Sequence, residues 1–147
     1  MQRRSFIQLI GLFVASLLLP IQAFAAVWNK AAFEATRAEN AIQGLGIPAQ
    51  MISSKEIEVI APDLAENGAV VQIEITSRIP NTESIAIVVD HNPTPLIATF
   101  NFSNGALPYV VTRIKMAETS DVQAIIKVGS QYFTAKKRVE VLENGCG

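Results

Sequence analysis

Residues 71–75, Val-Gln-Ile-Glu-Ile, alternate apolar and polar side chains at every position. A period of two places Val71, Ile73 and Ile75 on one face of a β-strand and the polar side chains on the other face. A strand with one apolar and one polar face is typical of antiparallel sheets that pack on a core and leave the other side in water. The stretch therefore predicts a half-buried antiparallel strand.

Similar stretches recur along the chain, separated by turn signals rich in Pro, Gly, Asn and Ser. The further segments are 55–61, 84–90, 96–102, 109–116, 121–128 and 132–141. Residues 62–68, Pro-Asp-Leu-Ala-Glu-Asn-Gly, are interpreted as a turn. About seven short strands at this spacing predict an all-β fold, an antiparallel β-sandwich.

Residues 28–46 carry a helical pattern instead. Ala38, Ile42 and Leu45 share one helix face, and Asn29 is a suitable N-cap. The segment is either two short helices or a single bent one. Because a helical pattern occurs only here, before the strands, a parallel sheet with crossover helices is not expected.

The first 25 residues have the pattern of an export signal. Arg3 and Arg4 precede an apolar run over 9–19, Pro20 follows, and 23–25 read Ala-Phe-Ala, a small-x-small cleavage pattern. Paired arginines before Phe and Ile favour the twin-arginine route, and the alternative is an ordinary secretory signal. We therefore expect a signal peptide over 1–25, a sandwich domain over 26–142 and a periplasmic location.

Composition excludes several classes of function. The chain carries 12 Lys and Arg against 13 Asp and Glu, so its net charge is −1, and removal of Arg3 and Arg4 leaves 10 against 13, or −3. A nucleic-acid-binding surface is usually strongly basic, so no nucleic-acid partner is expected. The mean hydropathy of +0.31 is raised by the signal segment, and no membrane span is expected after it.

The sequence lacks the usual sets of catalytic residues. There is one histidine, His91, which leaves little material for a histidine metal site or a catalytic triad, and it stands in a proline-rich turn. Residues 136–138, Lys-Lys-Arg, form a basic run expected on a solvated strand, with attraction of an anionic substrate or an acidic partner as the alternative. No metal, cofactor or catalytic residue is predicted.

The sole cysteine, Cys146, is the second-to-last residue. Exported proteins usually pair their cysteines, so a single one indicates an intermolecular bond or a free reactive thiol. The strand pattern stops near residue 142, so 143–147 are expected to form a flexible arm that reaches roughly 15 Å when extended. Asn144, Gly145 and Gly147 would give that arm its flexibility.

The neighbours of Cys146 do not activate it. Glu143 and the terminal carboxylate are negative and disfavour a thiolate, so activating charges would have to belong to other proteins. These features favour a carrier arm, a tethered handle that partner enzymes process in turn. Two alternatives are an exported interaction module with an incidental thiol and a cysteine that forms an interchain disulfide. A thiol redox protein is disfavoured because no second cysteine could resolve a mixed disulfide.

Nearly the whole mature chain resembles the SoxY family, the sulfur-carrier subunits of the periplasmic thiosulfate-oxidising Sox multienzyme system. The matching stretches are residues 61–71 (Ala-Pro-Asp-Leu-Ala-Glu-Asn-Gly-Ala-Val-Val), 83–87 (Glu-Ser-Ile-Ala-Ile), 92–96 (Asn-Pro-Thr-Pro-Leu), 112–116 (Thr-Arg-Ile-Lys-Met), 119–122 (Thr-Ser-Asp-Val) and 135–137 (Ala-Lys-Lys). The family ends in Gly-Gly-Cys-Gly-Gly. Here Gly145, Cys146 and Gly147 match its centre, Asn144 replaces the first glycine and the final glycine is missing.

The resemblance implies an immunoglobulin-like sandwich that forms a heterodimer with a SoxZ-like β-protein exported together with it. It also implies a cycle on Cys146. A haem enzyme joins thiosulfate to the thiol, a hydrolase releases sulfate, and a sulfane dehydrogenase oxidises the remaining sulfur where one is present. The carrier itself would be no enzyme, and thiosulfate-derived adducts on Cys146 would be its cargo.

Overall fold

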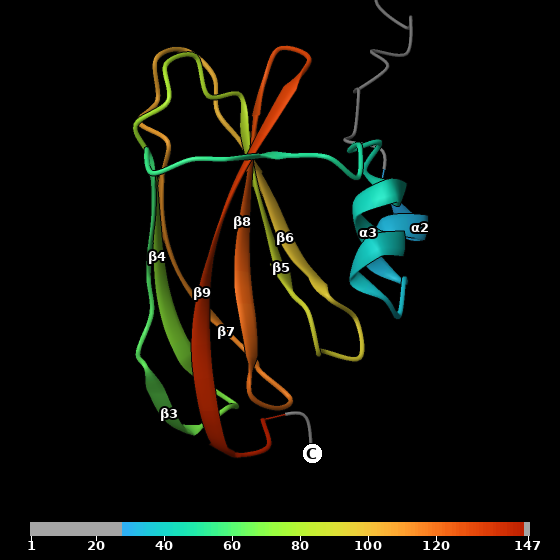
Figure 1. The fold of residues 1–147 in the computed structure, drawn as a ribbon, viewed down its shortest axis with the longest axis vertical. Helices are drawn as coiled ribbons and strands as arrows, with labels where there is room; N and C mark the ends of the chain where they lie inside the picture. Colours follow the sequence, from blue (N-terminus) through green and yellow to red (C-terminus); the bar gives the residue numbers. More distant parts are fainter. Residues whose placement is uncertain (1–27, 146–147) are drawn as a thin grey trace, which may run out of the picture.

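A computed structural model of the chain describes residues 28–145 (Figure 1). Two short helices precede the strands in the described part of the chain. The helices are α2 (Lys30–Phe33) and α3 (Ala38–Gly44). The strands are β1 (Ile52–Ser53), β2 (Ile57–Ile60), β3 (Leu64–Asn67), β4 (Val71–Ser77), β5 (Ser84–Val89), β6 (Leu96–Asn101), β7 (Tyr109–Ile114), β8 (Ser120–Val128) and β9 (Gln131–Glu143).

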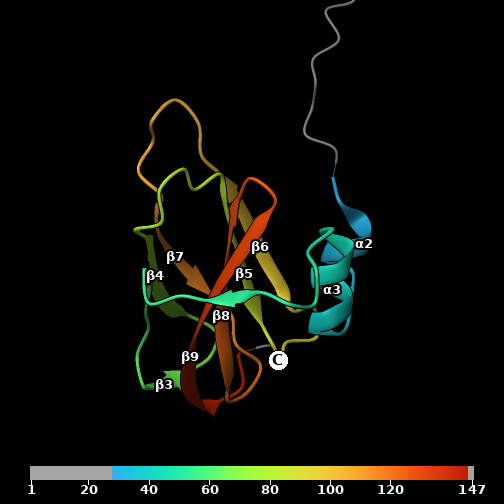
Figure 2. The same ribbon diagram turned by 45° about the horizontal axis from the view of Figure 1, so that its top comes forward.

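The strands form two sheets that face each other. The larger sheet has the order β1-β9-β8-β5-β6, with β3 also paired to β9, and the smaller sheet has the order β2-β4-β7. All neighbours in the smaller sheet are antiparallel, as are the β9-β8-β5-β6 pairs of the larger one. The predicted antiparallel β-sandwich is therefore confirmed (Figures 1 and 2).

The core lies between the two sheets. Val71, Ile73 and Ile75 of β4 are 2%, 0% and 0% exposed, and they meet buried side chains from β5, β8 and β9. The alternation of residues 71–75 thus has the predicted cause, one face in the core and one toward water. Each such aliphatic side chain contributes about 1.5–3 kcal/mol through removal from water.

Strands β5 and β8 are buried on both faces. The run from Ile85 to Val89 is buried without interruption, because α2 and α3 cover the outer face of the larger sheet. Ala32 and Ala41 of the helices pack there against Val88 and Ile125. Figure 1 shows both helices on the side of the sheet away from β4 and β7.

The helical segment consists of two short helices, one of the two predicted forms. The side chain of Asn29 caps α2 as expected: its Oδ1 accepts from the amide of Ala32 at 3.1 Å. Its Nδ2 also donates to the carbonyl oxygen of Gly44 at 2.8 Å, which ties the helices together. A Cβ on Gly44 would lie 2.9 Å from the Cα of Ala32, so this contact requires a glycine.

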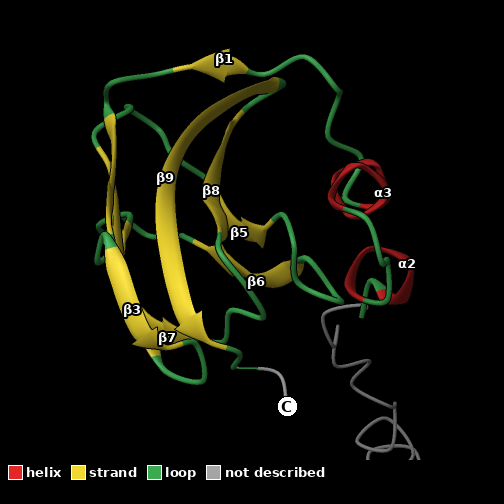
Figure 3. Ribbon diagram, turned by 60° about the horizontal axis from the view of Figure 1, so that its bottom comes forward, coloured by secondary structure: helices red, strands yellow, loops and turns green. Residues whose placement is uncertain are grey.

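Residues 62–68 differ from the predicted turn because they contain strand β3. Strand β3 pairs in parallel with the end of β9, with Leu64 opposite Glu140 and Asn67 opposite Glu143. The ladder also carries β9 on to Glu143, one or two residues beyond the predicted end of the strand. Figure 3 shows β3 and β9 side by side at the end of the sandwich where the described chain ends.

Neither α2 nor α3 is long and apolar enough to cross a lipid bilayer.

Candidate functional site

The described chain ends at one end of the sandwich, next to the predicted carrier residue. Cys146 and Gly147 lie outside the described residues, and Gly145 is joined to Cys146 by one peptide bond. The end of β3 lies beside this point, as does the segment from β7 to β8, which contains Met116 (Figure 3). The base of the predicted arm can therefore be described residue by residue.

Three backbone hydrogen bonds hold that base. The amide of Gly145 donates to the carbonyl oxygen of Met116 at 3.1 Å. The amide of Met116 donates to the carbonyl oxygen of Gly68 at 2.8 Å, and the amide of Gly68 donates to that of Glu143 at 2.9 Å. The structure differs here from the expected flexible arm over 143–147, because Glu143 belongs to β9 and Gly145 is tied to the sandwich.

Gly68 and Gly145 lie against each other, and both are buried. A Cβ on Gly145 would overlap the carbonyl group of Gly68 and the amide of Ala69. A Cβ on Gly68 would overlap the carbonyl oxygen of Met116 and lie 2.9 Å from a methyl carbon of Val141. Neither glycine has a positive φ, so close approach rather than turn geometry requires glycine at both positions.

Asn92 supports the Met116 segment from inside. Asn92 as a whole is 7% exposed, and its Nδ2 donates to the carbonyl oxygen of Lys115 at 2.7 Å. Its Oδ1 accepts from the amide of Ala117 at 2.9 Å. These two hydrogen bonds fix the backbone on both sides of Met116, and Met116 is itself hydrogen-bonded to Gly68 and Gly145.

Each cation of the basic run is paired. Lys136 lies 2.9 Å from Asp90 and Arg138 lies 3.5 Å from Asp121. Lys137 pairs with Asp63, and its hydrogen bond and charge hold the pKa of that carboxyl below its ordinary value. Because three aspartates already neutralise the run, the solvated-strand interpretation fits better than attraction of an anionic substrate.

His91 lies at the surface, with half of its side chain exposed. Its Nδ1 is 3.0 Å from the carbonyl oxygen of Thr119 and 3.3 Å from Oε1 of Glu118. Among residues 28–145, no three His, Cys, Asp or Glu side chains are grouped so that they could hold a metal ion.

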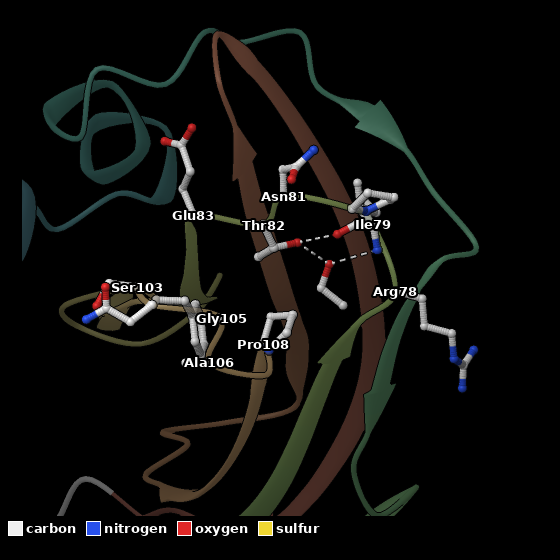
Figure 4. A pocket seen from close by; sticks show the side chains of 13 residues that line it. Arg78, Ile79, Asn81, Thr82, Glu83, Ser103, Gly105, Ala106 and Pro108 are labelled. Atoms are coloured by element: carbon white, nitrogen blue, oxygen red, sulfur yellow. Dashed lines mark hydrogen bonds between the residues drawn. The ribbon is translucent and has the colours of Figure 1, made fainter.

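A cleft of about 450 Å³ lies at the opposite end of the sandwich, between the β4–β5 and β6–β7 loops (Figure 4). Polar side chains that line the cleft are hydrogen-bonded within it. Ser77 Oγ lies 2.7 Å from Thr82 Oγ1, and Thr82 Oγ1 donates to the carbonyl oxygen of Ile79 at 2.8 Å. The charged side chains at its rim, Arg78 and Glu83, pair with Glu58 and Lys127. The cleft therefore presents no group prepared for catalysis.

Comparison with known proteins agrees with the resemblance seen in the sequence. The model of the family "Sulfur oxidation protein SoxY" matches residues 43–146. The chain belongs to the SoxY family. The match extends to the cysteine at residue 146, and it includes all nine strands of the described region.

The solved structures include a sulfur carrier protein SoxY from Chlorobium limicola f thiosulfatophilum. It is 30% identical to this SoxY-family chain with a TM-score of 0.66, over 78% of this chain and 99% of that one. Toxic shock syndrome toxin-1 (14% identity, 58% of this chain and 99% of that one, TM-score 0.40) is more distant. So is a Jonesia denitrificans lytic polysaccharide monooxygenase (17% identity, 70% and 66%, TM-score 0.37). A search of curated proteins gave no match.

The sequence reasoning named Cys146, Asn144, Gly145 and Gly147 but missed Gly68 and Met116. Gly68 was included in a predicted turn, where its partner in space could not be seen. One signal in the sequence could have pointed to Gly68. Asn67-Gly68 is a pair that usually forms a two-residue hairpin turn, but the strand after it starts only at Val71, so the pair does not close such a hairpin.

Proposed function

We propose that this SoxY-family chain is a periplasmic carrier that holds sulfur intermediates covalently on Cys146 while partner enzymes process them. The main support is the family match, which runs through residue 146 and so includes the chain's single cysteine. The solved relative that covers most of the chain is itself described as a sulfur carrier protein. The carrier performs no catalysis of its own.

The loading step is an oxidation. The thiol of Cys146 and thiosulfate join through a new S–S bond, the thiol proton is released, and two electrons pass to an acceptor. The resemblance to the SoxY family implies that the acceptor is a haem-containing partner enzyme, and this chain has no second thiol that could take the electrons. The groups that deprotonate the thiol would also belong to that partner.

The unloading steps follow from the chemistry of the adduct. Water attacks the terminal sulfonate sulfur, and the bond between that sulfur and the sulfane sulfur breaks. Sulfate and one proton leave, and the other proton of water remains on the persulfide that is left on Cys146. A hydrolase partner would supply this step, and a sulfane dehydrogenase would oxidise the persulfide where that enzyme is present. The sandwich serves as the handle that each partner recognises in turn.

Export and pairing complete the proposal. Residues 1–25 direct the chain to the twin-arginine route, which carries folded proteins, so a SoxZ-like subunit without its own signal can leave the cytoplasm as a heterodimer with it. Because both subunits would share one export step, export of each would depend on Arg3 and Arg4.

The test is intact mass spectrometry of the heterodimer after incubation with thiosulfate and the haem partner. We expect a mass increase on the wild-type chain, located by fragmentation to the C-terminal peptide. The matched control is Cys146→Ser, which changes one atom and leaves the sandwich intact. Equal adduct formation on Cys146→Ser would refute the proposal.

A shortened chain separates the carrier from an interaction module. A chain that ends at Gly145 keeps every described contact of the arm base and removes only Cys146 and Gly147. The carrier function predicts loss of thiosulfate-dependent electron transfer with heterodimer formation intact. Full activity of the shortened chain would favour the interaction module instead.

A further inference from the structure

The base of the arm is hydrogen-bonded to the sandwich at Met116. Its carbonyl oxygen accepts the amide hydrogen of Gly145 at 3.1 Å, and its own amide donates to Gly68 at 2.8 Å. The side chain of Met116 is fully buried in the core. The end of β9, the end of β3 and the β7–β8 segment therefore meet at a point that the core holds in place.

The contact between Gly68 and Gly145 tolerates no side chain on either residue. A Cβ on Gly145 would overlap the backbone of Gly68 and Ala69, and one on Gly68 would lie 3.0 Å from the amide nitrogen of Gly145. The position of Gly68 is itself fixed, because Asn67 Oδ1 accepts from the amide of Ala69 at 2.8 Å. We call Gly68, Met116 and Gly145 together the arm clasp.

We propose that Gly68 and Met116 are positioning residues for Cys146, and that the arm clasp holds the base of the arm docked on the free carrier. This inference rests on the proposed carrier function of Cys146. Cys146 follows the clasp residue Gly145 directly, and one residue spans roughly 3.5 Å when extended. The thiol is then presented from a fixed point at one end of the sandwich rather than from a tether that starts at residue 143.

A fixed base has a direct consequence for catalysis by partners. A short tether confines the thiol to a small volume. This raises the effective concentration of the thiol at the active site of any partner enzyme that binds the same end of the sandwich. A partner site deeper than this reach is served only after the hydrogen bond between Gly145 and Met116 opens. The clasp thus sets how closely each partner must approach the β3–β9 end.

Two measurements test the clasp on the full chain without any partner enzyme. The first is hydrogen exchange of the Gly145 amide. The second is the mobility of a nitroxide attached to Cys146, the only cysteine available for labelling. In the wild-type chain we expect the Gly145 amide to exchange at least about tenfold more slowly than an unstructured glycine amide.

The test variants are Gly68→Ala and Gly145→Ala, and the matched control is Gly129→Ala. Gly129 lies in the β8–β9 turn with open space around it and a φ of 58°, so alanine there strains the fold without touching the clasp. In both test variants the amide of residue 145 should exchange at least about tenfold faster relative to the unstructured rate of the residue present, and nitroxide mobility should increase. The control should leave both readouts unchanged. Should Gly68→Ala fail to fold, Gly145→Ala decides the test alone.

Exchange of the wild-type Gly145 amide at the unstructured rate would overturn the proposal. An unchanged exchange rate in folded Gly145→Ala would do the same. These outcomes are independent of the carrier function, because missing sulfur adducts on a chain with a protected Gly145 amide would refute the function and leave the clasp standing.

Discussion

Gly68 and Gly145 pack backbone against backbone at the end of the sandwich, and the carbonyl group of Gly68 occupies the space where a side chain of residue 145 would have to lie. Both residues are also hydrogen-bonded to Met116: the amide of Gly145 donates to its carbonyl oxygen, and the carbonyl oxygen of Gly68 accepts from its amide. Close packing, and not flexibility, therefore explains why the residue before Cys146 is a glycine.

The two glycines of the clasp should differ in their effect on stability. Gly68→Ala forces a methyl group onto the carbonyl oxygen of Met116 and toward Val141, both within the sandwich, so we expect a loss of about 1–3 kcal/mol in the free energy of unfolding. Gly145→Ala should cost less than about 1 kcal/mol, since residue 145 lies beyond the end of β9 and can move out of the clasp without breaking a β-ladder. Urea unfolding of both variants checks this order, and the reverse order would contradict the described packing.

Asn92 should be a major contributor to stability at this end of the fold. Asn92→Ala leaves the carbonyl oxygen of Lys115 and the amide of Ala117 without their partners in a buried position. We expect the free energy of unfolding to fall by about 2–3 kcal/mol. Asn101→Ala, an exposed asparagine of β6, is the control and should change it by no more than about 0.5 kcal/mol. Equal effects of the two substitutions would show that Asn92 does not brace the Met116 segment.

The ion pair between Asp63 and Lys137 should make a small part of stability depend on acid pH. The folded pKa of Asp63 is lowered from its ordinary 3.8, first by the hydrogen bond from Lys137 and then by the charge of that lysine. The pair therefore stabilises the fold above the unfolded pKa, and its contribution is lost as the pH falls through the folded pKa. Because Asp63 is exposed, salt should weaken the contribution further.

The melting temperatures of wild type and Asp63→Asn measure this effect. The wild type should melt higher at neutral pH and low salt, and the difference should vanish at strongly acidic pH. Glu66→Gln serves as control, because Glu66 is exposed in β3, three residues after Asp63, and forms no ion pair among residues 28–145. A difference that grows as the pH falls would contradict the assigned sign.

Removal of the thiol should leave the fold unchanged. The proposed carrier function gives Cys146 no part in holding the sandwich together, so the melting temperature of Cys146→Ser should match that of the wild type within about 1 °C. Electron transfer from thiosulfate should nevertheless be lost. A clear drop in melting temperature would mean that Cys146 has a structural role in addition to the proposed one.

Local patterns predicted the parts of the fold that depend on local causes. The alternation in β4 follows from one buried face, and Asn29 caps α2 through an atom three residues away. The sequence could show that Ile85–Val89 is a strand, but not that helices cover its outer face, since that burial depends on contacts with α2 and α3.

The parts that the sequence did not reveal depend on distant partners. Strand β3, Leu-Ala-Glu-Asn, is four residues long and mostly exposed, with turn residues at both ends, and only its pairing with β9 makes it a strand. Gly145 looks the same in sequence whether it frees the chain or fits against Gly68. Contact with Gly68 is what distinguishes a packed Gly145 from a flexible one, and only the folded chain brings Gly68 and Gly145 together.

The most direct test of the carrier function uses the protein as cells load it. The chain is isolated from cells that oxidise thiosulfate, and its intact mass is measured before and after treatment with a thiol reductant. We predict a sulfur-containing adduct that fragmentation places on Cys146 and that the reductant removes, with none on Cys146→Ser from the same host. A wild-type chain that carries only the unmodified mass, or an adduct that persists on Cys146→Ser, would contradict the carrier function.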